Sequence, residues 1–215
     1  MYISKILLDV SIPLVRSELA DLNRLKSTLS KSVIGGTFLY RIENVPLDKN
    51  GYMQPLVLVS ENKPDKSASG KPSGFFSAIE TYEYNIPVRY GMVYKFLLKA
   101  NPSTRIIFFN SEIEGSELQV KWLESESLSG GFQLIDCSVK QDGYISSGEE
   151  KVKLLSVIFE GSMKITDENR FRQMLNKGIG RGREYGLGLV SVESYGCKNR
   201  NIAEEMKAHA ESITS

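Results

Sequence analysis

The sequence repeats one order of predicted strands and helices, and this order constrains the fold more than any other feature. In the first half, β-forming residues at 2–10 precede an amphipathic segment at 15–33 whose apolar residues recur at helical spacing. Two segments typical of strands follow at 37–45 and 54–61, with Pro, Asn and Gly between them where a turn is expected. The first unit is therefore predicted to run β-α-β-β.

A second series begins in the same order and then continues further. A predicted strand at 91–100 leads through a turn at 101–105 to a helix at 116–128, which ends at Gly130 and Gly131. Two predicted strands follow at 131–140 and 151–165, with a polar turn at 141–150 between them. A helix at 166–177, capped by Thr166 or Asp167, and a last strand at 187–193 complete the series. This order fits two ferredoxin-like (RRM-like) β-α-β-β-α-β units in tandem, so the predicted fold class is α+β.

The repeat predicts two domains and a tail. We expect an N-terminal domain at 1–88, a C-terminal domain at 89–194 and a polar tail at 195–215. The segment 62–74 is poor in apolar residues and rich in Pro, Gly, Ser and Lys, a composition typical of a mobile loop rather than of packed structure. Its lysines also give it charge for contact with a polyanion.

The composition argues against several classes of protein. A formal net charge of +1 is not that of a wholly basic nucleic-acid-binding protein, so any contact with nucleic acid must come from a local patch. Cys137 and Cys197 lack metal-ligand spacing and His209 is the sole histidine, so we expect neither a metal site nor a cofactor. The opening residues do not form a secretion signal and no apolar run reaches about eighteen residues, which predicts a reduced, cytoplasmic protein without a membrane segment.

A glycine-rich stretch at 177–189, KGIGRGREYGLGL, contains five glycines and three basic residues. It does not fit a dinucleotide-binding or P-loop motif, because it follows a helix, precedes a strand and lacks the Lys-Ser/Thr ending. Two interpretations remain open. The glycines can form a tight helix-to-strand turn, or their amides can cradle phosphates while Arg181 and Arg183 supply positive charge.

Basic residues gather around this stretch. Between positions 170 and 183 there are five basic residues and no acidic one: Arg170, Arg172, Lys177, Arg181 and Arg183. Because ferredoxin-like sheets and their loops commonly serve as RNA platforms, this local patch indicates RNA binding. The residues predicted to bind RNA here are Lys177, Gly180, Arg181, Gly182 and Arg183.

One long block and several short segments together resemble a known family. The block is VIFEGSMKITDENRFRQMLNKGIGRGREYGLGLVSV at 157–192, and the weaker segments are 1–9, 16–33, 38–43, 94–105 and 121–134. They are similar to the CasE endoribonucleases of type I-E CRISPR systems, members of the RAMP superfamily. The resemblance covers almost the whole chain and leaves out only the tail.

The resemblance implies an enzyme that binds the hairpin of a CRISPR repeat transcript and cuts at its 3′ base without a metal. In this family a 2′-hydroxyl attacks the adjacent phosphate and leaves a 2′,3′-cyclic phosphate. The expected partners are the CRISPR repeat RNA hairpin (crRNA) and the other subunits of a Cascade complex. Lys153 matches a basic position of the family pattern and is expected to grip the hairpin stem with Lys151, although a charged strand end facing water explains Lys151 equally well.

The family's usual catalytic histidine is missing from the first helix. Lys26 stands in its place, and Asn23 stands where the family carries a tyrosine three residues earlier. Lysine, with a pKa of roughly 10.4, is charged at neutral pH, so Lys26 is expected to stabilise charge or donate a proton rather than to act as a base. Lys31 is expected near the same face, and the predicted catalytic residues are Lys26, Lys31 and Asn23.

Other interpretations of these residues stay open. Without the family pattern, Lys26 is simply an exposed helix residue. Loss of the histidine and the tyrosine also suits a catalytically inactive subunit that binds the crRNA hairpin. A third alternative is an unrelated ferredoxin-like RNA-binding protein without a CRISPR role.

Overall fold

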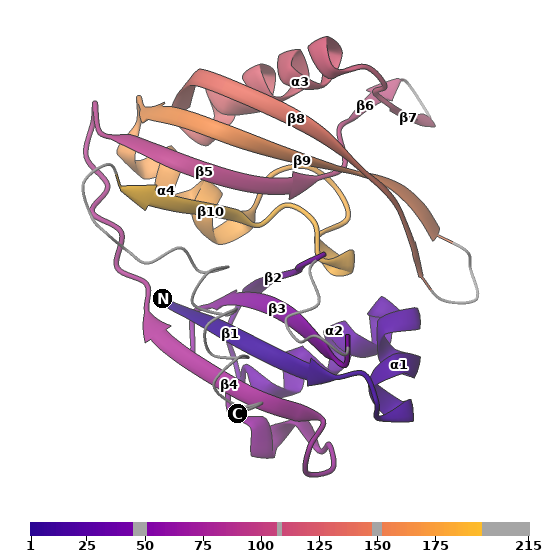
Figure 1. The fold of residues 1–215 in the computed structure, drawn as a ribbon. Coiled ribbons are helices and arrows are strands. Elements are labelled where there is room, and N and C mark those ends of the chain that lie inside the picture. Colours follow the sequence, from indigo (N-terminus) through magenta and orange to yellow (C-terminus); the bar gives the residue numbers. More distant parts are fainter. Residues whose placement is uncertain (45–50, 107–108, 148–151, 195–215) are drawn as a thin grey trace. The chain divides into compact units, whose positions relative to one another are not determined.

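The computed structural model describes residues 1–44, 51–106, 109–147 and 152–194. The chain divides between Asn85 and Ile86, and we name the parts before and after this point unit 1 and unit 2 (Figure 1). Each unit contains its own four-stranded antiparallel sheet, and the two are described separately.

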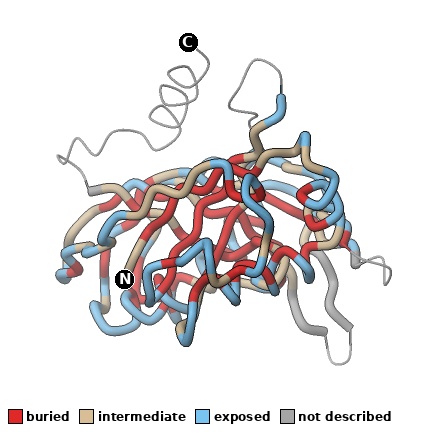
Figure 2. Tube along the Cα trace, turned by 90° about the horizontal axis from the view of Figure 1, so that it is seen from below, coloured by how far each residue is buried: buried red, intermediate tan, exposed pale blue. Residues whose placement is uncertain are grey.

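Unit 1 is built on a sheet in the order β2-β3-β1-β4. Its strands are β1 (Tyr2–Asp9), β2 (Phe38–Ile42), β3 (Met53–Ser60) and β4 (Phe76–Glu83). The central strands β1 and β3 are buried along most of their length, and buried positions appear red in Figure 2. A central pair flanked by β2 and β4, with helical residues between β1 and β2, is the strand order of a ferredoxin-like unit.

The amphipathic segment predicted as one helix forms two helices. They are α1 (Pro13–Ala20) and α2 (Leu22–Ser32), separated at Asp21. Asp21 has φ −127° and ψ 89°, outside the helical region, and its side chain accepts a hydrogen bond from the N–H of Asn23. Aspartate competes with the helical backbone in this way and is favoured at helix caps, so the single-helix prediction was wrong at this residue.

The segment 62–74, predicted to be a mobile loop, packs against α2. It contains a short 3-10 helix, η1 (Lys66–Ser69), which Asp65 caps by accepting a hydrogen bond of 2.8 Å from the N–H of Ser67. The N–H of Asp65 in turn donates to the carbonyl of Ser32 at the end of α2, at 2.8 Å. Local hydrogen bonds of Asp and Ser therefore order a segment whose low apolar content had indicated a loop.

Unit 2 repeats the topology with a sheet in the order β10-β5-β9-β8. Its main elements are β5 (Val93–Ala100), α3 (Ser116–Gly130), β8 (Phe132–Ser147), β9 (Val152–Ile165), α4 (Glu168–Lys177) and β10 (Val190–Ser194). As predicted, α3 ends at Gly131 in a left-handed conformation with φ 69°. The prediction that Thr166 or Asp167 caps α4 is also confirmed, because the side chain of Asp167 accepts from the N–H of Arg170 at 2.9 Å.

Two predicted turns of unit 2 are wrong. The residues expected to turn after β5 begin a short hairpin of β6 (Ser103–Ile106) and β7 (Phe109–Glu112). The polar turn expected at 141–150 is mostly strand, because β8 continues to Ser147 opposite the start of β9. Strand pairing, a tertiary effect, overrides the turn-like composition at both places.

The far ends of β8 and β9 form a two-stranded extension, which we name the arm (143–147 and 152–156). Within the described pairing, β5 meets β9 only from Val157 onward, so residues 152–156 pair with β8 alone. Figure 1 shows these paired ends running beyond the rest of the sheet.

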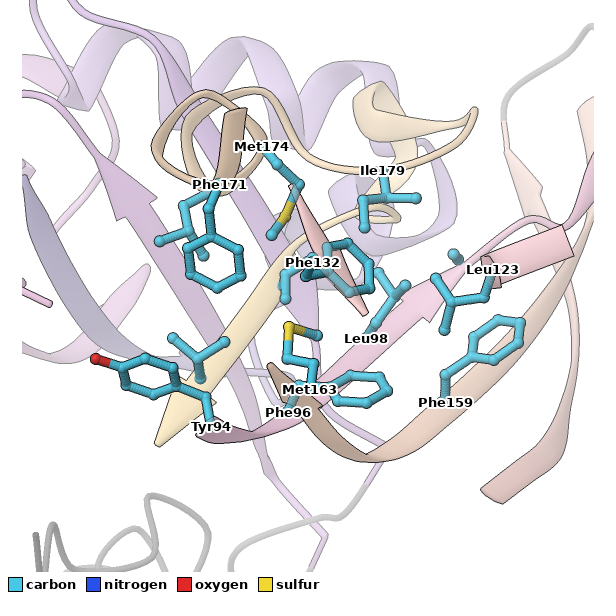
Figure 3. Packing of buried hydrophobic residues seen from close by; sticks show 14 of the residues in the cluster. Tyr94, Phe96, Leu98, Leu123, Phe132, Phe159, Met163, Phe171, Met174 and Ile179 are labelled. Carbon is cyan, nitrogen blue, oxygen red and sulfur yellow. The ribbon is translucent and has the colours of Figure 1, made fainter. Parts of the chain in front are cut away.

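The core of unit 2 packs α4 and Ile179 against the sheet (Figure 3). The ring of Phe171 lies edge-on to Phe132, with centroids 6.4 Å apart, and stacks against Tyr94 at 6.2 Å. Ile179, two residues after α4, is buried in the same cluster. The beginning of the glycine-rich stretch is therefore anchored in the core.

Candidate nucleic-acid interface

The glycine-rich stretch forms a loop between α4 and β10, which we name the glycine loop (178–188). Helix α4 ends at Lys177, and the next residue, Gly178, adopts φ 72° and ψ 175°. The N–H of Ile179 donates to the carbonyl of Gly188 at 2.9 Å, which brings the two ends of the loop together. A short 3-10 helix, η2 (Arg183–Tyr185), lies within it.

Three glycines of this loop leave little room for a side chain, most clearly Gly188, where φ is 85° and a Cβ would lie 2.6 Å from the carbonyl oxygen of Ile179. Gly180 has φ 78°, and a Cβ there would lie 3.1 Å from the ring of Trp122. Gly182 has φ 77°, and a Cβ there would lie 2.8 Å from Leu154 and 3.0 Å from Leu187. Since positive φ is itself unfavourable for other residues, these positions favour glycine. These contacts support the tight-turn interpretation of the stretch.

The amides of the loop fall into two groups. The N–H groups of residues 178–179 and 185–188 donate to backbone carbonyls of unit 2. Among the residues that the structure describes, none accepts a hydrogen bond from the N–H of Gly180, Gly182 or Arg183. Gly182 is left-handed and Arg183 begins a helical turn, a succession that directs neighbouring amides into an anion-binding nest. The packing of the glycines and the bonded amides at both ends therefore support the turn interpretation, and the unbonded amides in the middle of the loop support the phosphate-cradle interpretation as well.

Three basic side chains border these amides. Arg181 and Arg183 are exposed, and so is Lys177, the last residue of α4. The Nε of Arg183 donates to the carbonyl of Gly180 at 3.1 Å, and the backbone of Arg181 forms a β-bridge with Asn101. The loop therefore combines donor amides with positive charge, which is the chemistry that binds a phosphate.

The two other basic residues of the predicted patch hold unit 2 together. Arg170 donates to the carbonyl of Leu128 at 3.2 Å and lies 3.6 Å from the carboxylate of Asp167. Arg172 donates to the carbonyl of Val88 at 2.9 Å. Of the five basic residues in the predicted patch, the three beside the glycine loop therefore remain as candidate phosphate contacts.

A carboxylate that sequence reasoning missed lies close to the same loop. Partial burial raises the pKa of Glu126 above its ordinary value of 4.5, while the positive charge of Arg183 acts in the opposite direction. Glu126 follows Trp122 by one helical turn, and Trp122 packs on Gly180, so both lie on one face of α3. That four-residue spacing from a buried tryptophan is the signal that could have found it.

On the arm, the predicted RNA contact Lys153 is exposed and pairs with an aromatic ring. Its Nζ lies 4.1 Å from the centroid of the Tyr144 ring, in cation–π geometry. Tyr144 is itself 48% exposed, so a cation and a ring share one surface. Lys151 lies outside the described residues.

A buried ion pair holds the base of the arm. Asp142, which the sequence placed in a turn, lies 2.8 Å from Nζ of Lys99 and accepts a hydrogen bond of 2.7 Å from Ser156. Lys99 is only 7% exposed. The pair stands at a bulge of β8, between Gln141 and Gly143. Because separating a buried pair leaves an uncompensated charge, it fixes β8 against β5 at this point.

The three predicted catalytic residues are exposed on α2, but they do not lie together. Asn23 and Lys26, three positions apart, share one side of the helix. Lys31 follows Lys26 by five positions, about 140° around the helix axis. It lines a pocket of about 240 Å³ whose lining includes neither of the other two residues. The expectation that Lys26 and Lys31 lie near the same face is therefore not met.

Two absences hold for the part of the chain that the structure describes. There, no three side chains of His, Cys, Asp or Glu gather as potential metal ligands. No helix within the same residues is both long and apolar enough to cross a bilayer. His209 and Cys197 lie outside the described residues.

The two sheets define a tandem ferredoxin-like protein of the α+β class, as predicted, with a basic glycine loop in its second unit. A family model described as CRISPR associated protein matches residues 1–194, and the chain belongs to this family. The alternative of an unrelated ferredoxin-like RNA-binding protein is therefore wrong.

Individual relatives give the same answer. The CRISPR-associated endoribonuclease Cse3 of Thermus thermophilus is 29% identical in an alignment of 215 positions, gaps included, that covers 89% of this chain and 99% of that protein. A structure of Thermus thermophilus Cse3 bound to an RNA representing a pre-cleavage complex has a TM-score of 0.79 at 25% identity, covering 89% of this chain and 98% of that one. A chain of a CRISPR RNA-guided surveillance complex shares the fold at 19% identity and a TM-score of 0.63, covering 91% of this chain and 100% of that one. The resemblance to CRISPR endoribonucleases is confirmed at the level of the family.

Proposed function

We propose that this protein is an endoribonuclease that binds the hairpin of a CRISPR repeat transcript and cuts it to mature crRNA. The observation that carries the proposal is the match, over nearly the whole length of both chains, to the endoribonuclease Cse3, which is known in complex with RNA. The cut leaves a 2′,3′-cyclic phosphate and needs no metal. The protein then stays on the processed RNA as a subunit of a Cascade-type complex in the cytoplasm.

In this proposal, the C-terminal domain (89–194) holds the hairpin. The amides of Gly180 and Arg183 receive a backbone phosphate, because they have no other acceptor among the described residues, and the buried Gly182 supplies the left-handed turn between them. The side chains that add positive charge are Lys177, Arg181, Arg183 and, on the arm, Lys153 and Lys151. Recognition of paired RNA through its backbone and shape suits such a set of amides and cations.

The N-terminal domain (1–88) carries the residues proposed for chemistry. In-line attack by a 2′-hydroxyl needs a proton acceptor, a proton donor for the leaving 5′-oxygen and positive charge near the phosphorane. We assign Lys26 to the position of the family's histidine and Asn23 to that of its tyrosine. Lys26 then supplies charge or a proton to the leaving group rather than removing a proton. Lys31, on another side of α2, acts on a neighbouring phosphate.

The proposal is tested by incubating the protein with the repeat RNA of its own CRISPR array in EDTA. The expected result is cleavage at one site, with a 2′,3′-cyclic phosphate on the upstream product, identified by mass spectrometry. The same RNA with a 2′-deoxynucleotide before the cut should bind equally well and stay intact. Failure to bind the repeat RNA would reject the whole proposal.

A catalytically inactive hairpin-binding subunit is the second candidate. The assignment of Lys26 and Asn23 to the positions of the family's histidine and tyrosine supports this candidate, because neither residue is an effective general base at neutral pH. Tight binding of the unmodified RNA without any cleavage, with or without a divalent metal, would support this candidate over the first.

A further inference from the structure

A pocket opens on the surface of unit 1 where α1, α2 and the segment 62–74 meet. Its volume is about 240 Å³, and its lining includes Glu18, Arg24, Ser27, Thr28, Lys31 and Lys71. Most of these side chains are charged or carry a hydroxyl group. With Ser17, the other hydroxyl side chain of the lining, they offer charge and hydrogen-bond donors to a polar ligand, and Leu14 is the one apolar residue of the lining.

The floor of the pocket is a buried carboxylate with two partners. Glu18 is 2% exposed, and one of its oxygens accepts a hydrogen bond of 2.7 Å from the hydroxyl of Thr28. The other oxygen forms an ion pair with Nζ of Lys71, which also lies 5.5 Å from the centroid of the Phe75 ring. A buried carboxylate is stable only when it is paired in this way. Glu18 therefore fixes the position of the Lys71 ammonium group.

Lys71 is fixed but still reaches the pocket. Its side chain is 20% exposed, compared with 3% for Glu18. An ammonium group has three donors, so contact with one carboxylate oxygen leaves hydrogen-bonding capacity on the pocket side. Ser27, one turn from Lys31 on α2, adds a hydroxyl at the rim.

Positive charge outweighs negative charge around the pocket. Three cations line it, Arg24, Lys31 and Lys71, against the single carboxylate of Glu18. Asp21, which lies 3.1 Å from the Arg24 guanidinium outside the lining, raises the number of carboxylates to two. A net positive pocket with hydroxyl donors is complementary to a phosphate group.

We propose that this pocket holds a backbone phosphate of the single-stranded RNA that flanks the hairpin, with Lys71 and Arg24 as contacts and Glu18 as the positioning residue for Lys71. The inference rests on the proposed function. Helix α2 also carries Lys26, so the RNA strand cut beside Lys26 would also contact the pocket, on another side of the same helix. It adds an anchoring point outside the glycine loop and the arm that contacts neither the stem nor its bases.

Two RNAs and three variants test this site in the full-length protein. The RNAs are the repeat hairpin trimmed at its base and the same hairpin with a few 3′ nucleotides, both with 2′-deoxynucleotides around the base to prevent cleavage. The variants are Arg24→Gln, the double variant Glu18→Gln/Lys71→Gln, and Lys71→Arg, which keeps both the charge and the pairing with Glu18. Lys66→Gln is the matched control, because Lys66 is exposed on the same segment and outside the pocket.

Affinity is measured by fluorescence anisotropy over a range of salt concentrations. Arg24→Gln and the double variant are expected to bind the flanked RNA about tenfold more weakly and to lose about 0.7 of the slope of log K against log salt, the contribution of one single-strand phosphate contact. Their affinity for the trimmed hairpin should not change. Lys66→Gln should bind both RNAs like the wild type, and Lys71→Arg, which keeps the positive charge, should bind the flanked RNA more tightly than the double variant does.

Thermal unfolding establishes which variants are folded. If the double variant does not fold, Arg24→Gln still tests the pocket, because Arg24 is exposed. Wild-type affinity and salt slope of the folded variants for the flanked RNA would overturn the pocket while hairpin binding stands. Equal loss of affinity for both RNAs would overturn it as well. Absence of binding by the wild type would reject the proposed function and the pocket together.

Discussion

At the scale of single residues, the proposed chemistry depends on Lys26. Lys26→Ala should slow cleavage of the repeat RNA by about a hundredfold or more, because one well-placed donor or cation is worth roughly 3 kcal/mol in the transition state. The dissociation constant should change little, since the hairpin is held elsewhere. Single-turnover cleavage and a binding titration measure the two effects separately.

Ser30→Ala serves as the control for Lys26→Ala, because Ser30 is exposed on the same helix one turn later. Lys26→Arg keeps the positive charge and should retain part of the rate. Equal cleavage rates of Lys26→Ala and the wild type would clear Lys26 of any catalytic role.

Glu126 gives a second prediction at this scale. Because its pKa is raised, the folded protein favours the protonated form of Glu126. The resulting contribution to folding stability is complete below the ordinary pKa of 4.5 and is lost as the pH rises through the raised pKa. At neutral pH the ionised carboxylate opposes the attraction of Arg183 for phosphate. Glu126→Gln should therefore bind the hairpin about two- to fivefold more tightly at pH 7.

The difference between Glu126→Gln and the wild type should shrink as the pH falls below the raised pKa, because the wild-type side chain then becomes neutral as well. Hairpin affinity of both proteins, measured at the same pH values, checks this. An affinity ratio that is the same at all pH values would contradict the assignment to Glu126.

At the scale of elements, the sequence predicted what local chemistry decides. The order of most strands and helices along the chain, the end of α3 at Gly131 and the Asp167 cap of α4 were all visible in it, since each depends on a few neighbouring residues. It missed the break at Asp21, because a capping residue inside an amphipathic repeat looks like a solvent-facing position. It also treated Arg170 as part of a patch, although the partners of this side chain become known only from the fold.

The pocket of unit 1 shows the limit of sequence reasoning more clearly. Glu18 and Lys71 are 53 positions apart, and no spacing rule relates them. Lys31 was singled out from its helix alone, but the pocket that it lines requires a segment that was expected to be a loop. Tertiary contacts of this kind follow from the packing of elements, which composition and periodicity do not determine.

The glycine loop carries the prediction at this scale. Gly182→Ala should lower the free energy of unfolding by about 1 to 2 kcal/mol for the left-handed conformation and by more for the contacts with Leu154 and Leu187. Hairpin affinity should fall as well, since the nest is displaced. Gly91→Ala is the matched control, because its φ is +82° but no atom lies within 4 Å of an added Cβ. Equal destabilisation of the two variants in denaturant unfolding would contradict the role of packing at Gly182.

At the scale of the whole molecule, the formal net charge of +1 shapes how RNA is selected. A chain with 27 basic and 26 acidic side chains has little general attraction for polyanions. Binding must therefore come from the few places where cations and unengaged amides coincide. Such a protein discriminates by the shape that presents its phosphates at those places, rather than by the amount of nucleic acid nearby.

The glycine loop and the base of the arm are joined by Asn101 and Leu154. The backbone of Asn101 bridges to Arg181, its side chain donates to the carbonyl of Leu155 at 2.8 Å, and Leu154 packs at Gly182. Folding of unit 2 therefore sets the distance between the two surfaces that are proposed to bind the RNA, before the RNA is bound. An RNA stem whose width matches this distance binds without the entropic cost of ordering the protein. A stem of another width would bind only if contacts anchored in the core of unit 2 were strained.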